Sequence, residues 1–172
     1  HVVVIPSLHW GDRIEAPGPE WEILGDHIPG TYAELVSVPA DCLAPKPAGF
    51  SWVQAAALPL VGVTTYRALL TRGRLHSGES MLVVGAGGGI ATMAVQLASH
   101  CGASIAVTSS SADKIAAAVA AGATAGVLHT EPDWPERARE LSPGGAGFDL
   151  VLDPVGRWPE SVRALRPGGR LV

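Results

Sequence analysis

Residues 81–91 of the chain read Met81-Leu82-Val83-Val84-Gly85-Ala86-Gly87-Gly88-Gly89-Ile90-Ala91. The run opens with apolar residues typical of a buried β-strand, and its glycine-rich end leads directly into an apolar helical pattern. A strand, a glycine turn and a helix in this order place free backbone N–H groups beside the positive end of a helix dipole. The run therefore predicts a site for a pyrophosphate, as in the first βα turn of a dinucleotide-binding fold.

The spacing G-x-G-x-x-G/A fits this turn in two registers, over residues 86–91 and over residues 85–90. The first register ends on Ala91, which is small enough to pack closely on the strand, whereas the second ends on the larger Ile90. We prefer the first register, and a glycine-rich turn without a ligand is the alternative. The residues expected to bind the cofactor in this turn are Gly87, Gly88, Gly89 and Ile90.

The next expected strand, over residues 104–108, predicts which cofactor is bound. Its end carries Ser109, Ser110 and Ser111, followed by Lys114, and no carboxylate. An acidic residue at this tip would bind the ribose hydroxyls of NAD and repel a 2′-phosphate, whereas hydroxyls and a lysine do the reverse. The pattern favours NADP(H), with Ser109, Ser110 and Lys114 as ligands. The serines also suit the cap of the next helix, over residues 112–121, and one can cap while others bind.

Composition limits the classes of function. The 172 residues carry 12 Lys and Arg against 16 Asp and Glu, a net charge of −4, which argues against nucleic acid or an anionic membrane as a partner. We expect no membrane span and no signal peptide at the start of the chain, and both of its ends read as cut. Cys42 and Cys101 lie far apart and six histidines are scattered, so we expect a reducing cytoplasmic location and no metal site.

Periodicity predicts two regions. Residues 1–46 read as part of an irregular β-rich domain, with strands over Val2–Ile5 and residues 32–38. Residues 47–172 begin with a capping box, Ser51-x-x-Gln54, and a helix that Pro59 is expected to interrupt. From residue 81, strands over 81–84, 104–108, 126–129, 149–152 and 169–172 alternate with helices near 90–99, 112–121, 134–141 and 159–165. This alternation predicts an α/β fold with a doubly wound parallel sheet.

Several separate motifs occur in a familiar order: Gly30-Thr31-Tyr32-Ala33-Glu34, Val38-Pro39-Ala40, Ala55-Ala56-Ala57-Leu58-Pro59-Leu60, the glycine turn with Ala94-Val95-Gln96-Leu97-Ala98, and Asp153-Pro154-Val155-Gly156. Together they resemble the medium-chain dehydrogenase/reductase superfamily, in which zinc-dependent alcohol dehydrogenases and quinone oxidoreductases pair a GroES-like domain with a Rossmann domain. The resemblance implies that residues 1–46 are the end of a GroES-like domain and residues 47–172 an incomplete Rossmann domain. It covers about half of a family member.

The resemblance bears on metal binding position by position. Where zinc alcohol dehydrogenases carry their third catalytic ligand, this chain has Leu60, and the segment that matches their structural-zinc lobe, from Leu8 to Leu24, has no cysteine. A leucine cannot coordinate zinc. The resemblance therefore favours a zinc-independent reductase, in which NADPH delivers hydride to a quinone, an enone or another small carbonyl compound.

The resemblance also assigns Thr64 an orienting role near the nicotinamide, with a buried structural threonine as the alternative, and implies a homodimer or homotetramer. A zinc-dependent alcohol dehydrogenase of the same superfamily stays open. A methyltransferase is a further alternative because residues 165–172 resemble the proline-glycine turn before a late strand in those enzymes, although Ser109 stands where they need an acid. The last alternative is a non-catalytic NADPH-binding protein.

Overall fold

The computed structural model describes residues 1–172, which form two compact units, His1–Val63 and Thr64–Val172. The division falls within helix α1 (Trp52–Tyr66). The predicted domains, 1–46 and 47–172, divide the chain at an earlier point and stay a prediction.

The first unit contains two small antiparallel sheets. Strand β1 (Val2–Val4) pairs with β4 (Leu43–Pro45), and β2 (Ser7–Leu8) pairs with β3 (Glu22–Ile23). A 3₁₀ turn, η1 (Ala40–Cys42), precedes β4. The early strand is confirmed, but the strand expected over residues 32–38 is wrong: no strand pairs with this segment, and its alternating side chains are exposed, with Leu35 90% accessible. Alternation alone does not make a strand, since the backbone groups also need partners.

Helix α1 begins with the predicted capping box. The Ser51 hydroxyl accepts a hydrogen bond from the Gln54 N–H, and the Gln54 side-chain oxygen accepts one from the Ser51 N–H. The expected interruption at Pro59 is wrong, because the helix runs through this residue and continues into the π-helical turn η2 (Arg67–Arg72). Proline's fixed φ suits a helix, so the loss of one N–H donor does not end this one.

The merged helix also bears on the expected absence of a membrane span. Trp52–Arg72 is 21 residues long and apolar enough to cross a membrane by length and composition, so the expectation that no segment meets that criterion is wrong. Core helices of other proteins pass the same test, and this feature alone assigns no membrane partner.

The second unit is built on one five-stranded parallel sheet in the order β7-β6-β5-β8-β9. The strands are β5 (Ser80–Val83), β6 (Ser104–Ser109), β7 (Ala125–Leu128), β8 (Phe148–Leu152) and β9 (Leu165–Leu171). The helices between them are α2 (Gly89–His100), α3 (Ala112–Ala120), α4 (Trp134–Glu140) and α5 (Trp158–Arg163), with the 3₁₀ turn η3 (Pro143–Gly145) before β8. The predicted doubly wound parallel sheet is confirmed. Strand β9 begins four residues earlier than predicted and contains an irregularity opposite β8.

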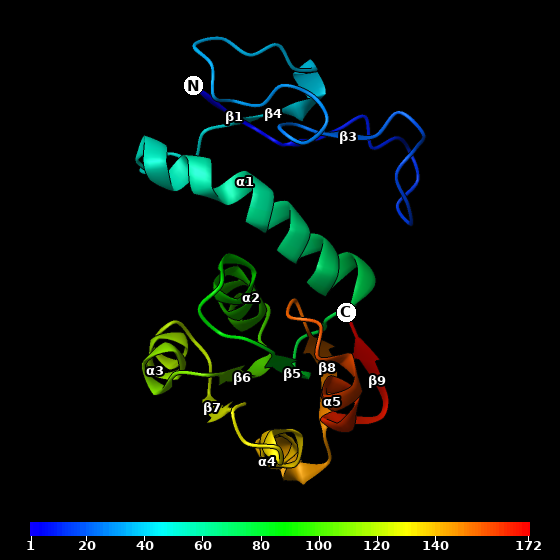
Figure 1. The fold of residues 1–172 in the computed structure, drawn as a ribbon, viewed down its shortest axis with the longest axis vertical. Helices are drawn as coiled ribbons and strands as arrows, with labels where there is room; N and C mark the ends of the chain where they lie inside the picture. Colours follow the sequence, from blue (N-terminus) through cyan, green and yellow to red (C-terminus); the bar gives the residue numbers. More distant parts are fainter. The chain divides into compact units, whose positions relative to one another are not determined.

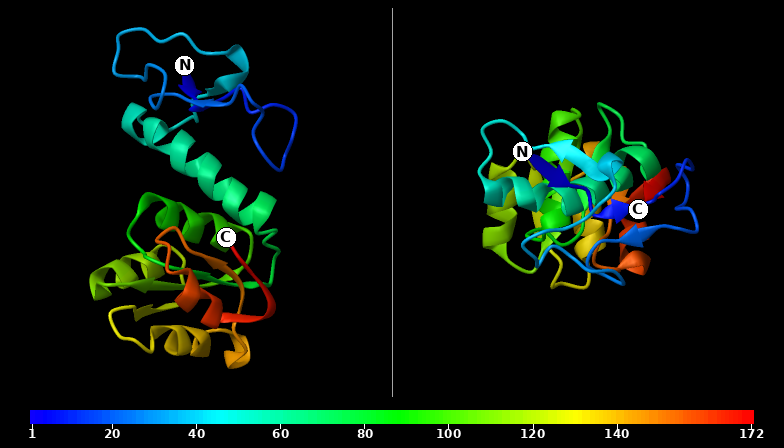
Figure 2. Two further views of the ribbon diagram at one scale, coloured as in Figure 1. Left: turned by 45° about the vertical axis from the view of Figure 1, so that its right-hand side comes forward. Right: turned by 90° about the horizontal axis from the view of Figure 1, so that it is seen from above.

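Helices cover both faces of this sheet (Figure 1), with α2 and α3 on one side and α4 and α5 on the other. Alternate residues of β5 divide between the two layers: Met81 and Val83 join the core beneath α2 and α3, and Leu82 joins the core beneath α4 and α5. The left view of Figure 2 shows the same layers from another side. Because all five strands are parallel, their carboxyl ends meet at one edge, where ligands bind in open α/β sheets.

Candidate functional site

The glycine turn between β5 and α2 lies at this carboxyl edge. Gly85 and Gly87 have positive φ values of 86° and 106°, which favour glycine. The Gly85 N–H donates to the backbone carbonyl oxygen of Thr108 at the end of β6 (3.1 Å), and the Ala86 N–H donates to the same oxygen (2.6 Å). The turn is thus fixed on the neighbouring strand.

The first N–H groups of α2 are free donors on the side of this turn that faces away from β6. Gly88 is the N-cap of α2, and its missing side chain leaves the helix without a side-chain cap. The first N–H groups of an α-helix have no intrahelical acceptor, and α2 has 12 residues to build a dipole. A Cβ at Gly88 would meet nothing within 4 Å, so the space outside the turn is open. This arrangement can accept a phosphate anion.

The packing of the turn agrees with the preferred register. Ala91 is 2% accessible and belongs to the core beneath α2, whereas Ile90 is partly buried at the edge of that core. The small residue therefore stands where the helix approaches the sheet.

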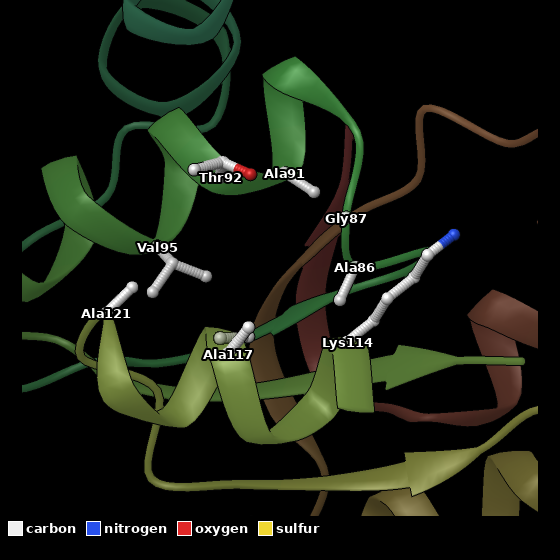
Figure 3. A pocket seen from close by; sticks show the side chains of 9 residues that line it. Ala86, Gly87, Ala91, Thr92, Val95, Lys114, Ala117 and Ala121 are labelled. Carbon is white, nitrogen blue, oxygen red and sulfur yellow. The ribbon is translucent and has the colours of Figure 1, made fainter. Parts of the chain in front are cut away.

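Lys114, in the first turn of α3, crosses the glycine turn. Its Cδ lies 2.7 Å from where a Cβ at Gly87 would be, so the stem of the lysine occupies the space that the glycine leaves. Figure 3 shows the side chain running past Ala86 and Gly87 with its ammonium group beyond them. No salt bridge engages this ammonium group. A positive charge is therefore held beside the free donors of the turn.

The three serines at the tip of β6 have three different surroundings. Ser109 is buried, and its hydroxyl donates to the Ala86 carbonyl (3.4 Å) and accepts from the Ser111 N–H (3.2 Å). Ser111 caps α3, since its hydroxyl accepts from the Lys114 N–H (3.4 Å). Ser110 is exposed. Ser111 is thus the serine that has the expected capping role. Of the two predicted serine ligands, Ser109 and Ser110, only Ser110 is exposed.

A cavity of about 120 Å³ lies between α2 and α3 behind Lys114 (Figure 3). Its wall consists mainly of small apolar side chains, namely Ala91, Val95, Ala117, Ala118 and Ala121. Lys114 is the only charged residue that lines the cavity. The cavity is therefore an apolar space beside the lysine stem and does not form a second polar site.

Sequence reasoning missed one group at this edge, the pair His129 and Arg157. His129 follows β7, where its Nδ1 lies 2.9 Å from the Thr108 hydroxyl, and Arg157 donates to its backbone carbonyl (3.0 Å). The signal that could have identified His129 is its position directly after an expected parallel strand, because the carboxyl ends of parallel strands lie at one edge of the sheet.

Thr64, the predicted orienting residue, lies on an exposed position of α1 at the start of the second unit. Its role stays a prediction. The sequence allows Tyr32 and Tyr66 as substrate-cleft residues and favours core packing for each. They are 108% and 57% accessible, so core packing is wrong for both, and a place in a cleft stays a prediction.

No group of three or more His, Cys, Asp or Glu side chains within residues 1–172 is arranged to hold a metal ion. Leu60, at the position predicted to lack a zinc ligand, is an exposed aliphatic residue of α1. Zinc-independence of the protein stays a prediction.

Comparison with known proteins connects this geometry to a class of enzymes. Residues 89–172 match the family model described as zinc-binding dehydrogenase. The chain is 32% identical over 154 residues to a 2-methylene-furan-3-one reductase of Solanum lycopersicum, an alignment that covers 89% of this chain and 38% of that protein.

Two solved structures are similar to the chain in fold and sequence. An NAD-dependent alcohol dehydrogenase superimposes with a TM-score of 0.92 and 38% identity, covering 99% of this chain and 52% of that one. A quinone oxidoreductase from Thermus thermophilus, described together with its NADPH complex, superimposes with a TM-score of 0.70 and 38% identity, covering 79% and 44% of the two chains. The chain thus spans between about two fifths and one half of the length of these proteins.

Proposed function

Because the chain belongs to the medium-chain dehydrogenase/reductase superfamily, we propose that it forms the cofactor-binding part of an oxidoreductase that uses NADPH. The proposed reaction is transfer of a hydride to a quinone, an enone or another small carbonyl compound. The family match argues against the methyltransferase alternative.

The observation that carries the choice of NADPH is the position of Lys114. Its stem is packed over Gly87, so the charge is held beside the turn without a large entropic cost on binding. The exposed Ser110 lies at the tip of β6, and residues 109–111 contain no carboxylate. A lysine and hydroxyls without an acid suit an additional phosphate group.

The residues that would hold the cofactor divide into two groups. The N–H groups at the start of α2, in Gly88, Gly89 and Ile90, and the backbone of Gly87 suit the pyrophosphate, whereas Lys114 and Ser110 suit the 2′-phosphate. When bound, NADPH supplies the hydride, and the protein supplies orientation and exclusion of water. Thr64 is proposed to orient the nicotinamide end through its hydroxyl.

Use of NAD is the competing proposal, and one observation favours it. The solved structure with a TM-score of 0.92 is described as an NAD-dependent alcohol dehydrogenase. Cofactor preference therefore has to be measured directly.

Titration of the chain with NADPH and NADH, followed by cofactor fluorescence, tests the proposal. We expect tighter binding of NADPH, and we expect Lys114→Ala to weaken NADPH by about 1.5–3 kcal/mol, the range of a hydrogen bond to a charged group, with little effect on NADH. Lys114→Met is the matched control for packing, since it keeps an apolar stem over Gly87 and removes only the charge. Equal affinity of the parent protein for the two cofactors would contradict the assignment.

Zinc-independence has a separate test. We propose that turnover needs no metal, supported by Leu60 and by the absence of a three-ligand cluster within residues 1–172. A zinc ion that co-purifies with the complete protein and is needed for turnover would contradict this. The cytoplasmic location and a homodimeric or homotetrameric assembly stay predictions.

A further inference from the structure

A chain of hydrogen bonds runs along the carboxyl edge of the sheet and ends at the glycine turn. Arg157, in the segment after β8, donates to the His129 carbonyl (3.0 Å), and the His129 N–H donates to the Ser109 carbonyl (3.0 Å). The His129 imidazole Nδ1 lies 2.9 Å from the Thr108 hydroxyl, which lies 3.2 Å from the Gly85 nitrogen. The segments that follow or end four neighbouring strands are therefore connected through three side chains.

The donors along this chain can be assigned from chemistry. The Gly85 N–H can only donate, so it uses a lone pair of the Thr108 hydroxyl oxygen. Thr108 is fully buried, and its hydroxyl hydrogen reaches an acceptor at Nδ1 of His129 only when Nδ1 is unprotonated. Satisfaction of this hydrogen favours the neutral imidazole with its proton on Nε2.

We propose that His129 is a positioning residue, which holds the Gly85 end of the phosphate-binding turn in place by accepting the hydrogen bond of the Thr108 hydroxyl. This rests on the proposed binding of a dinucleotide at the turn. His129 does not contact the cofactor in this proposal and acts only through Thr108. Neither residue belongs to the glycine pattern or to the serine tip.

The surroundings of His129 favour the neutral form. Burial lowers the pKa of His129 from its ordinary 6.5, and the nearby Arg157 guanidinium lowers it further. Protonation would turn Nδ1 into a donor and leave the Thr108 hydroxyl hydrogen without this acceptor. The connection to Gly85 should therefore be complete above pH 6.5 and weaken as the pH falls below it.

Among the charged groups near His129, which include Glu131 and Asp133 on the same loop, the Arg157 guanidinium is the one that shifts its pKa. The adjacent end of β6 offers the neutral Thr108 and Ser109, and the turn after β5 offers no ionisable group. Asp153, at the end of β8, uses its carboxylate for the N–H groups of residues 155 and 156 and for the Ser161 hydroxyl. In α4, the Glu136 carboxylate pairs with Arg163.

An NMR titration of the cofactor-free chain tests the connection itself. In the parent chain, we expect the Gly85 amide resonance to move with the same midpoint as the His129 ring protons, at a pH below 6.5. In Thr108→Val, which is nearly isosteric and keeps the backbone acceptor, the Gly85 resonance should no longer follow the imidazole. The Gly122 amide, at the end of α3 away from this edge, is the internal control.

Cofactor affinity tests the positioning role. We expect His129→Leu and Thr108→Val each to weaken binding about threefold to tenfold, the range of one neutral hydrogen bond, and the double variant to be no weaker than either alone. His129→Asn keeps an acceptor near the position of Nδ1 and does not titrate. It should keep the parent affinity at neutral pH and lose the acid dependence that the parent shows. Measurement with NADH beside NADPH removes any effect from titration of the 2′-phosphate.

Three results would overturn this inference. They are a Gly85 resonance that follows His129 equally well in Thr108→Val, an unchanged affinity in His129→Leu, and a parent affinity that rises on acidification. The last would mean that the imidazolium attracts the phosphates directly. A parent chain that binds neither dinucleotide would instead defeat the proposed function, whereas normal binding with unaffected variants would defeat only the role of His129.

Discussion

Gly87 and Gly88 are neighbours in one turn, yet their backbones and surroundings differ. Gly87 has a φ of 106°, and a Cβ there would lie 2.7 Å from the Cδ of Lys114. Gly88 has a φ of −82°, and a Cβ there would meet nothing within 4 Å. The first glycine is required by the fold of the turn and by the lysine, whereas the second leaves room outside the protein.

This difference predicts unequal effects of alanine. Gly87→Ala should lower the free energy of unfolding by about 1–3 kcal/mol because an L-residue is strained at this φ. The new Cβ should also displace Lys114 and so weaken the binding of NADPH. Gly88→Ala, the matched control, should cost clearly less stability. Urea unfolding and cofactor titration of both variants measure the two effects. Equal destabilisation by the two substitutions would contradict this account.

Thr65 presents the opposite case, a polar group that the fold does not use. The residue is fully buried, and its hydroxyl oxygen has no hydrogen-bond partner. Burial of a hydroxyl without a partner costs about 1–3 kcal/mol in proteins.

Thr65→Val should therefore stabilise the chain by about 1 kcal/mol or more, since valine has nearly the same shape and is also β-branched. Thermal and urea unfolding of the variant beside the parent chain decide the point. A loss of stability in Thr65→Val would show that the hydroxyl makes a bond that matters.

At the scale of elements, local sequence rules predicted what depends on neighbours along the chain. The Ser51–Gln54 capping box and the alternation of strands and helices after residue 81 are present because their causes lie within a few residues. The same rules failed at Pro59 and over residues 32–38, where the outcome depends on helix continuity and on a pairing strand elsewhere.

The candidate site divides in the same way. The glycine turn and Lys114 could be predicted because they follow a spacing, and the structure adds that the lysine stem packs on Gly87. The connection from His129 through Thr108 to Gly85 could not, since its members are 21 and 23 residues apart and meet only when parallel strands align. The sequence alone does not say which serine caps α3. The structure gives this role to Ser111, whose hydroxyl accepts from the Lys114 N–H, and it engages the Ser109 hydroxyl with the Ala86 carbonyl.

The capping box provides a prediction for helix α1. Ser51→Ala removes the hydroxyl that accepts the Gln54 N–H (3.2 Å) and should lower the free energy of unfolding by about 1 kcal/mol. Ser51→Gly should cost only a few tenths of a kcal/mol, because glycine leaves the helix end open to water. Urea unfolding followed by helical circular dichroism compares them. If alanine and glycine cost the same, the hydroxyl does not cap the helix.

At the scale of the whole second unit, the two edges of the sheet have different chemistry. The carboxyl edge carries the glycine turn and its free N–H donors, whereas two ion pairs lie at the amino edge. There, Asp149 accepts hydrogen bonds from the Ser80 N–H (2.8 Å) and hydroxyl (2.7 Å) and pairs with Arg166. Glu79 pairs with Arg170, which also donates to the Gly73 carbonyl.

These pairs set how the unit responds to acid. Burial by itself would raise the pKa of Asp149, but the hydrogen bonds from Ser80 and the pair with Arg166 outweigh it and lower the pKa below 3.8. Burial would likewise raise the pKa of Glu79. The hydrogen bonds that its carboxylate accepts from Arg170 and from the His76 N–H outweigh burial and lower this pKa below 4.5. Carboxylates with lowered pKa values stabilise the fold above the unfolded values and lose that contribution as the pH falls through the folded ones.

The free energy of unfolding of the chain should therefore begin to fall near pH 4.5 and continue to fall below pH 3.8. Asp149→Asn should cost about 1–3 kcal/mol at neutral pH, because it leaves Arg166 and both Ser80 donors without a charged partner, and it should flatten the loss below pH 3.8. Glu136→Gln is the matched control, since it removes a carboxylate from a pair whose side chains are both half exposed and should cost about 1 kcal/mol or less. Urea unfolding between about pH 2.5 and about pH 7, a range that spans both carboxylates, gives the comparison. An acid profile of Asp149→Asn that parallels the parent would mean that the pairs at the amino edge do not govern stability.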